Sequence, residues 1–351
     1  MAGCLLIVGA SARACAESAV RAGYEPVSFD LFCDQDLLAL GPATRLEAGY
    51  RDLDRMFPAG GEPWMYTGGL ENQPRLVDRL AARRPLWGIS GRALRCLRRP
   101  WRWCESLQAE GLPVPAWANA AGEPSLLKPL SGAGGKGIIP WAGGRLPPPW
   151  RAFRQRRIVG EPVASLFCAF ANRVELLGTT RQIIGGPAGP FSYRGSVGPI
   201  DFGTAADGLR RLGAVLAAQS GALGLFGIDG ILAEGRFVPV EVNPRYTASA
   251  EVIEMATGIP TVAWQAAAFG ASPAPLPRPP ARVVAKEIVY ARQDTTVPDG
   301  LAGLPGLADI PVPGEIVPAG WPILTMRAAG ATEDEAEEGL RSCREALAAK
   351  L

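Results

Sequence analysis

Two short apolar segments near residue 230 restrict the fold of this chain more than any other feature. The first is Gly227-Ile-Asp-Gly-Ile-Leu232 and the second is Val240-Glu-Val-Asn-Pro-Arg245. As a hairpin they place Glu241 and Asn243 on one face, because side chains alternate along a strand, and the pairing brings Asp229 opposite them. Three hard oxygen ligands on one face suit Mg²⁺, whose shell water and phosphate oxygens complete. The alternative is a hairpin whose exposed face is merely polar.

The chain contains no histidine. This removes the commonest general base, the commonest transition-metal ligand and every mechanism of the Ser-His-Asp or Cys-His type. Any chemistry must therefore use carboxylates, lysine, arginine, backbone amides and a bound ion. The seven cysteines include no Cys-x-x-Cys pair. Free thiols in a reducing cytosol explain them better than disulfides or zinc.

Length and charge set broad limits. A chain of 351 residues is expected to divide into two or three domains. Lys and Arg total 36 against 34 for Asp and Glu, so the overall charge requires neither a nucleic-acid nor a membrane partner. The first residues lack a basic region, and no apolar run is long enough to span a bilayer. We therefore expect a cytoplasmic protein without a signal peptide.

The N-terminal region predicts a β-α-β unit, the opening of a doubly wound parallel sheet. An apolar run at 4–8 meets a glycine turn at 9–13, and a helical pattern then leads to a strand that ends at Asp30. The glycine turn followed by Asp30 matches part of a dinucleotide-binding fingerprint, but Ser11 stands where the second glycine is needed. A tight turn, or a substrate anion at the helix N-terminus, are the alternatives.

The segment 64–72 predicts a strand that runs into a polar turn, followed by a helix over 74–84. Tyr66, Glu71 and Asn72 would then lie near the carboxyl end of a strand, where open α/β sheets bind ligands. A simple turn with an Asn cap is the alternative.

The segment 92–102 combines arginines with large apolar residues, a mixture seen in nucleic-acid-binding helices. The apolar residues recur at helical spacing, which favours core packing with a solvated arginine face, from which one arginine reaches a phosphate. The arginines are Arg92, Arg95, Arg98, Arg99 and Arg102.

The segment 125–139 predicts two strands joined by a glycine-rich loop. Lys128 lies on the first strand, the loop spans Ser131 to Gly137, and Lys136 lies at its tip. Backbone N–H groups of such a loop can wrap anionic oxygens, although the spacing is not that of a P-loop. A flap over phosphates explains the two lysines, whereas a flexible hairpin turn explains only the glycines. Pro147 to Pro149 predicts a linker before the strands that follow.

Four signals stand in a fixed order: the strand lysine and its flap, a Gly160-Glu161 turn, an isolated Asp229 after a long helix, and Glu-x-Asn-Pro-Arg at 241–245. This order resembles the ATP-grasp superfamily of carboxylate-amine and carboxylate-thiol ligases over nearly the whole chain. The resemblance implies α/β and α+β architecture in three parts. These are a Rossmann-like pre-ATP-grasp domain at 1–92, a two-lobed ATP-grasp domain at 93–270 and a small C-terminal α+β subdomain at 271–351.

The resemblance also implies roles for individual residues. Lys128 would contact the α- and β-phosphates, and the backbone of a hinge at 155–159 would bind adenine. Arg245 would steady the transferred phosphate, with Arg181 beside it in an anionic substrate site. The residues implied for the flap are Ser131, Gly132, Gly134, Gly135, Lys136 and Gly137. The hinge includes Arg157 and Ile158, and Glu161 would bind the ribose. Asp229, Glu241 and Asn243 would bind Mg²⁺ or Mn²⁺.

Two positions depart from the family pattern. A lysine that many members carry before the first helix of the ATP domain would fall near Arg99 and Pro100, and Arg99 is the candidate substitute. Arg156 stands in the hinge where an acid is frequent, so contacts to adenine are expected from the backbone.

The implied activity is Mg-ATP-dependent ligation of a carboxylic acid to an amine, expected to be an amino acid, through an acyl phosphate. ADP and phosphate are released, and a homodimer is compatible with this activity. A bicarbonate-activating carboxylase, a non-catalytic ATP sensor and a dinucleotide-dependent oxidoreductase are the alternatives. The stretches 9–13, 66–72 and 309–314 are similar to a subgroup linked to one-carbon cofactor (pterin or furan) biosynthesis, in which glutamate or a related amino acid joins a carrier.

Overall fold

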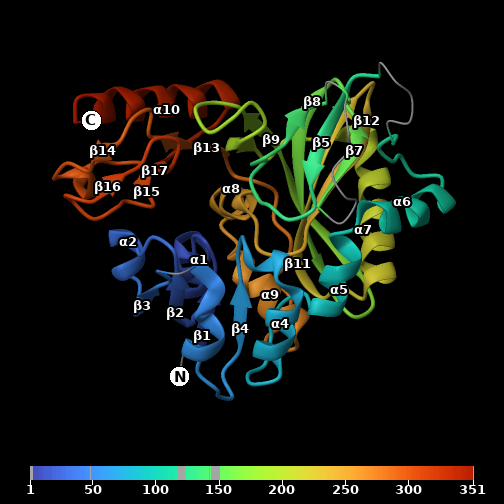
Figure 1. The fold of residues 1–351 in the computed structure, drawn as a ribbon, viewed down its shortest axis with the longest axis horizontal. Helices are drawn as coiled ribbons and strands as arrows, with labels where there is room; N and C mark the ends of the chain where they lie inside the picture. The colour runs from blue at the N-terminus through green and yellow to red at the C-terminus, as the bar shows by residue number, and fades with distance from the viewer. Residues whose placement is uncertain (1–2, 48, 118–122, 142, 144–150, 351) are drawn as a thin grey trace.

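The computed structural model describes residues 3–47, 49–117, 123–141, 143 and 151–350. These residues form four sheets, flanked by helices, and confirm the expected α/β and α+β architecture. Figure 1 shows the N-terminal part below the C-terminal part on one side of the molecule, with the middle part of the chain on the other side. The linker predicted at Pro147 to Pro149 lies outside the described residues.

The N-terminal sheet is parallel, with strand order β3-β2-β1-β4, which confirms the β-α-β prediction. Asp30 at the end of β2 accepts hydrogen bonds from the backbone N–H of Ala12 (2.6 Å), Phe32 (2.6 Å) and Cys33 (2.8 Å). The carboxylate therefore closes the tight turn before the first helix, which is one of the alternatives to cofactor binding there. The elements are β1 (Cys4–Val8), α1 (Arg13–Arg21), β2 (Glu25–Asp30), α2 (Gln35–Leu38), β3 (Ala43–Arg45), η1 (Gly49–Arg51), α3 (Leu53–Met56), β4 (Trp64–Tyr66), η2 (Leu70–Asn72) and α4 (Pro74–Ala81).

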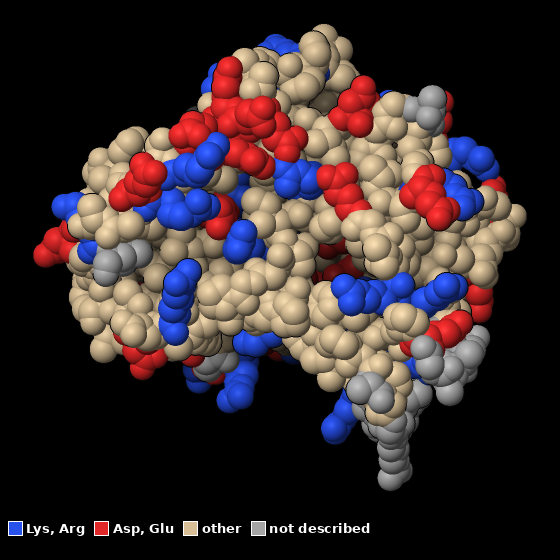
Figure 2. Space-filling model, turned by 90° about the horizontal axis from the view of Figure 1, so that it is seen from above, with Lys and Arg blue, Asp and Glu red and all other residues tan. Residues whose placement is uncertain are grey.

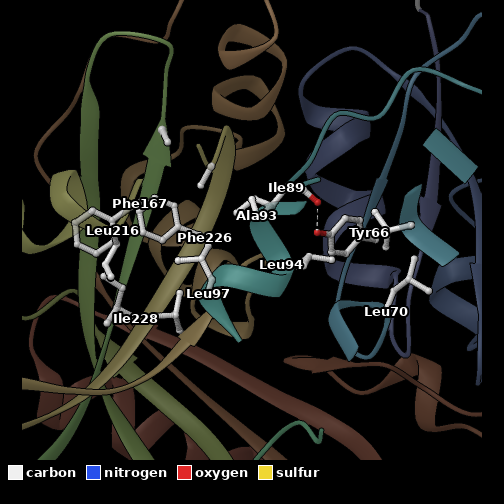
Figure 3. Packing of buried hydrophobic residues seen from close by; sticks show 14 of the residues in the cluster. Tyr66, Leu70, Ile89, Ala93, Leu94, Leu97, Phe167, Leu216, Phe226 and Ile228 are labelled. Atoms are coloured by element: carbon white, nitrogen blue, oxygen red, sulfur yellow. Dashed lines mark hydrogen bonds between the residues drawn. The ribbon is translucent and has the colours of Figure 1, made fainter. Parts of the chain in front are cut away.

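Two short helices, α5 (Gly91–Leu97) and α6 (Pro100–Ala109), connect this sheet to the rest of the chain. Figure 3 shows α5 between Tyr66 and Leu70 on one side and Phe226 and Ile228 on the other, all within one buried cluster. Burial of apolar area on both sides of α5 is the main force that fixes the two parts against each other. As predicted for 92–102, Leu94 and Leu97 are core and most of the arginines are exposed, whereas Trp101 is 37% exposed.

A small three-stranded sheet, β6-β5-β7, carries the glycine-rich loop. Its strands are β5 (Ser125–Pro129), β6 (Ile139–Pro140) and β7 (Ala152–Arg156), so the predicted strand-loop-strand arrangement is confirmed. The large sheet has eight strands in the order β12-β11-β8-β9-β10-β13-β17-β15. Its first strands and their helices are β8 (Glu161–Ala169), β9 (Val174–Ile184), β10 (Tyr193–Gly198), η3 (Gly203–Ala205), α7 (Ala206–Ser220), β11 (Gly224–Ala233), β12 (Arg236–Asn243), α8 (Ala248–Thr257) and α9 (Thr261–Ala268).

The longest strands of the C-terminal segment extend the large sheet. Strand β13 pairs antiparallel with β10, and β17 pairs with β13. Strands from both sides of the domain boundary expected at residue 270 therefore belong to the same sheet. The elements are β13 (Val283–Tyr290), β14 (Thr295–Thr296), η4 (Leu301–Gly303), β15 (Leu307–Ala308), β16 (Ile316–Val317), β17 (Pro322–Gly330) and α10 (Glu333–Ala348), with β14 and β16 forming a two-stranded sheet.

Charges of both signs are spread over the face shown in Figure 2, with one gathering of acidic side chains toward its upper edge. This mixture agrees with the nearly balanced composition. Within the described ranges, no helix is long and apolar enough to cross a membrane.

Candidate active site

The predicted hairpin is confirmed in its register. Asp229 of β11 pairs with Glu241 of β12, and Gly227 pairs with Asn243. Just past Asp229 the register shifts, so that Gly230 pairs with Pro239 and Val240 is passed over. The bulge turns the Val240 carbonyl toward the neighbouring lobe, where it accepts a hydrogen bond from Lys128 Nζ at 2.9 Å.

Asp229, Glu241 and Asn243 lie together, as predicted, on the wall of one cavity. Asn243 Nδ2 donates to Asp229 Oδ2 (2.8 Å), and Gln182 Nε2 donates to Asp229 Oδ1 (3.1 Å). Burial and the neighbouring Glu241 carboxylate raise the pKa of Asp229 to about 7. Although burial opposes it, Arg98 and Lys128 hold the pKa of Glu241 below its ordinary value.

This donor set fits Mg²⁺. Two partly buried carboxylates whose negative charges repel each other gain from a divalent cation between them, and an amide oxygen is a further hard ligand. No group of three or more acidic, His or Cys side chains is placed to hold a metal among the residues described. The remaining ligands would have to be phosphate and water oxygens, which is how Mg²⁺ is commonly bound in nucleotide sites.

Lys128 lies on β5 and is only 7% exposed. Its ammonium donates to the Val240 carbonyl and, at 3.3 Å, to Gln155 Oε1. Burial lowers the pKa of Lys128, while Glu241 and Asp229 act in the opposite direction. The lysine thus joins the lobe that carries the flap to the strand that carries the acids.

The cavity has a volume of about 540 Å³ and lies between the small sheet and the large sheet. The structure brings to it most of the predicted nucleotide and metal residues. They are Lys128, Gly134, Gly135, Arg157, Ile158, Asp229, Glu241, Asn243 and Arg245. Leu126, Ile138 and Ile231 add apolar surface of the kind that a nucleotide base needs.

The glycine-rich loop packs against the segment before β10. An added Cβ on Gly135 would lie 1.9 Å from the Phe191 carbonyl oxygen, and the Tyr193 N–H donates to the Gly134 carbonyl at 3.0 Å. Gly132 and Asn72 exchange hydrogen bonds of 3.2 Å in both directions. Among the other predicted flap residues, Ser131, Lys136 and Gly137 do not line the cavity, and Lys136 Nζ lies 5.9 Å from the centre of the Trp321 ring.

The structure does not bring Arg181 or Glu161 into this cavity. Arg181 pairs with Glu333 and, at 2.8 Å, with Glu337, both on α10. Its neighbour Gln182 faces the cavity, and since side chains alternate along β9, Arg181 must face the opposite side. Glu161 is exposed and lies 3.7 Å from the Arg181 guanidinium. Neither residue therefore belongs to the site as the structure presents it.

Arg98 is a site residue to which sequence reasoning gave no individual role. Its guanidinium donates to Glu241 Oε1 (2.9 Å), to Asn72 Oδ1 (2.9 Å) and to the Gly132 carbonyl (3.1 Å). Arg99, the expected substitute for the family lysine, is exposed. The only available signal was the proline at position 100, which breaks the helical pattern. It does not tell which of two adjacent arginines turns inward.

Arg245 is held by Glu71, which lies past the carboxyl end of β4, as predicted for the 64–72 segment. Arg245 Nε donates to Glu71 Oε1 at 2.7 Å, and Arg245 Nη2 donates to Asn243 Oδ1 at 3.3 Å. The Glu71 side chain is fully buried. The pair fixes the guanidinium beside the candidate metal ligands.

Comparison with known proteins agrees with this geometry. Residues 100–249 match the family model of an ATP-grasp domain. This segment, which contains β5 to β12, is the part of the chain that is similar to ATP-grasp domains. No match is found among curated proteins.

Solved structures share the fold over nearly the whole chain. An L-amino acid ligase from Bacillus licheniformis is 17% identical, with a TM-score of 0.70 and coverage of 98% of this chain and 97% of that one. A phosphoribosylamine-glycine ligase from Thermotoga maritima is 17% identical, with a TM-score of 0.73 and coverage of 97% and 96%. The biotin carboxylase domain of the Hydrogenobacter thermophilus 2-oxoglutarate carboxylase, in complex with MgADP, ADP and bicarbonate, is 16% identical, with a TM-score of 0.73 and coverage of 97% and 89%. At these identities the similarity concerns the fold.

Proposed function

We propose that this protein is a Mg-ATP-dependent ligase that joins a carboxylic acid to an amine through an acyl phosphate. The observation that carries the proposal is the convergence on one cavity of Lys128, the glycine flap and the Asp229, Glu241, Asn243 set. Positive charge and free backbone N–H groups suit phosphates, and the acids suit the cation that accompanies them. The ATP-grasp ligases of similar fold add support.

A carboxylate is a poor electrophile, so an amine cannot displace its oxygen directly. In the proposed reaction a carboxylate oxygen attacks the γ-phosphorus of ATP, and ADP leaves. The amine nitrogen then attacks the acyl carbon, the C–N bond forms, and phosphate leaves with the electrons of the C–O bond. Of the two protons lost by the ammonium, one ends on phosphate and one in solvent.

The chain's residues contribute position and charge. Lys128 and Arg245 are placed to neutralise phosphate oxygens, and Asp229, Glu241 and Asn243 would hold Mg²⁺, which offsets the charge that moves in the transfer. Arg98 positions Glu241. No step requires histidine, in agreement with the composition.

The test is ADP release from a panel of carboxylic acids combined with amines, with and without Mg²⁺. We expect a productive pair whose turnover requires the metal. Glu241→Gln should reduce turnover by about 100-fold or more, because it removes a charged ligand, while circular dichroism stays unchanged. Full turnover in this variant would exclude the metal assignment. A bicarbonate arm is included because a carboxylase domain shares the fold.

The similarity to the one-carbon subgroup stays a prediction. The screen tests it directly if glutamate is among the acids and among the amines.

A further inference from the structure

A second cavity, of about 240 Å³, adjoins the proposed nucleotide cavity. The two cavities share Arg245, Thr247 and Ala248 as lining residues, so a ligand in the second can reach the end of the first where the metal ligands lie. Its other walls come from the segments after β1, β2, β4 and β15, and from strands β13 and β17. The small volume suits a ligand well below drug size.

Segments far apart in the sequence hold this cavity together. Gln35 N–H donates to the Ile310 carbonyl at 2.8 Å, and Asp36 accepts hydrogen bonds from the backbone N–H groups of Asp309 (2.8 Å) and Ile310 (3.0 Å). Figure 1 shows α2 facing the loops around β15 across this junction. The cavity therefore exists only when the N-terminal sheet and the C-terminal segment are docked.

The positive charges that line the second cavity are already neutralised by partners. Arg13 Nε and Nη2 donate to the two oxygens of Asp309 (3.0 and 3.1 Å). Lys286 pairs with Glu251, which is buried, and Arg245 pairs with Glu71. A ligand carboxylate would have to compete with these buried carboxylates, and separating such a pair is costly.

Asp34 is the exception among the charged groups of the cavity. It lines the cavity and is 6% exposed, and within the described part of the chain its carboxylate has no hydrogen-bond or ion-pair partner. The acids around it differ: Asp30 accepts three backbone N–H bonds, and Asp36 and Asp309 have the partners given above. Burial, then Asp309, Asp30 and Asp36, raise the pKa of Asp34 to about 8, and Arg13 opposes them.

Ionising an unpaired buried carboxyl is costly unless a cation of a ligand compensates the charge. The other walls of the cavity are largely apolar and include Phe32, Ile288, Ile323 and Leu324. An ionisable carboxyl without a partner, beside an apolar surface, is complementary to a cation on an apolar body.

We propose that the second cavity binds the amine substrate through an ionic hydrogen bond from its ammonium group to Asp34. It would select primary amines with an apolar body and no adjacent carboxylate over amino-acid zwitterions. This inference rests on the proposed ligase function and narrows it, because the amine was expected from sequence to be an amino acid. An amino acid then remains a candidate for the acid side of the amide.

Calorimetry on the full chain saturated with ADP and Mg²⁺ tests the inference without turnover. Two matched series serve as probes: 2-phenylethylamine, phenylalanine and 2-phenylethanol, and hexylamine, norleucine and hexanol. At about pH 9 a carboxyl is ionised and a primary amine is still largely charged. We expect at least one amine to bind about tenfold or more tightly than its amino acid and its alcohol, as for a hydrogen bond between charged groups.

Asp34→Asn should remove this preference, so that amine and alcohol bind within about twofold of each other. Asp52→Asn, which removes the same charge from a half-exposed side chain outside the cavity lining, should keep the preference. The inference is overturned if neither amine binds, if the amino acid binds as tightly as the amine, or if Asp34→Asn keeps the preference. Failure of the ligase function would show separately, as absence of ADP release from ATP in the substrate screen.

Discussion

At the residue scale, the site depends on which of several similar side chains turns inward. Arg98 and Arg99 are adjacent and chemically identical, yet only Arg98 contacts Glu241 and the glycine loop. Gln182 and Arg181 are adjacent on β9, yet only Gln182 contacts Asp229. In each pair, a difference of one residue along the backbone decides whether the side chain faces the cavity or the opposite side.

The two arginines provide a matched test. Arg98→Ala should lower kcat/KM for ATP by about 100-fold, because Glu241 loses its cationic partner and Asn72 loses a donor. Arg99→Ala removes the same charge from an exposed position and should change kcat/KM less than about threefold. Steady-state kinetics with the productive substrate pair measures kcat/KM for ATP in both variants. Equal losses would show that general positive charge, and not the Arg98 contacts, is what matters.

At the scale of elements, the loop between β5 and β6 is held against the segment before β10. Gly134 and Gly135 both have positive φ angles, 63° and 76°, so alanine is strained at either position. Only at Gly135 does an added Cβ meet the Phe191 carbonyl; at Gly134 nothing lies within 4 Å. The two glycines therefore separate backbone strain from loss of the contact.

We expect Gly135→Ala to displace the flap and raise KM for ATP by about tenfold or more, since the loop would no longer cover the phosphates in one position. Gly134→Ala carries a similar left-handed strain of about 1 kcal/mol without the clash, and should raise KM less. Limited proteolysis of the loop, with and without ATP, provides a second measurement. A larger effect at Gly134 would contradict the packing described.

At the scale of the whole molecule, one buried acid joins three parts of the chain. Glu251 of α8 accepts from Arg13 of α1 (2.5 Å), pairs with Lys286 of β13, and accepts from Arg327 of β17 (2.8 Å). Burial alone would raise its pKa, but Arg13, Lys286 and Arg327 hold the pKa of Glu251 well below its ordinary value. The same group thus neutralises cations that line the second cavity.

Glu251→Gln should lower the free energy of unfolding by about 3–5 kcal/mol at neutral pH, because three cations lose a buried partner. A depressed carboxyl pKa adds stability above the pKa of the unfolded chain, and this stability is lost as the pH falls through the folded value. The difference between wild type and variant should therefore be complete above about pH 4.3 and shrink below it.

Urea denaturation across that pH range measures the difference. Glu338→Gln, which breaks an exposed pair with Arg341 on α10, is the control and should change stability by less than about 0.5 kcal/mol. A Glu251→Gln variant as stable as this control would contradict the assigned role.

The sequence alone determined the parts of the site that depend on local pattern. Alternation along a strand and the pairing of two adjacent segments predicted Asp229 opposite Glu241, and the register confirms it. The lysine strand, its glycine loop and the opening β-α-β unit were also predictable, because short-range spacing and turn chemistry specify them.

Only the tertiary structure decided what depends on segments distant in the chain. It selected Arg98 over Arg99, turned Arg181 toward α10, and continued the large sheet into the C-terminal segment. It also left Asp34 unpaired, within the described residues, in a cavity between the first and last parts of the chain. These outcomes follow from docking of surfaces that are far apart in the sequence, and no local pattern encodes how such surfaces are oriented.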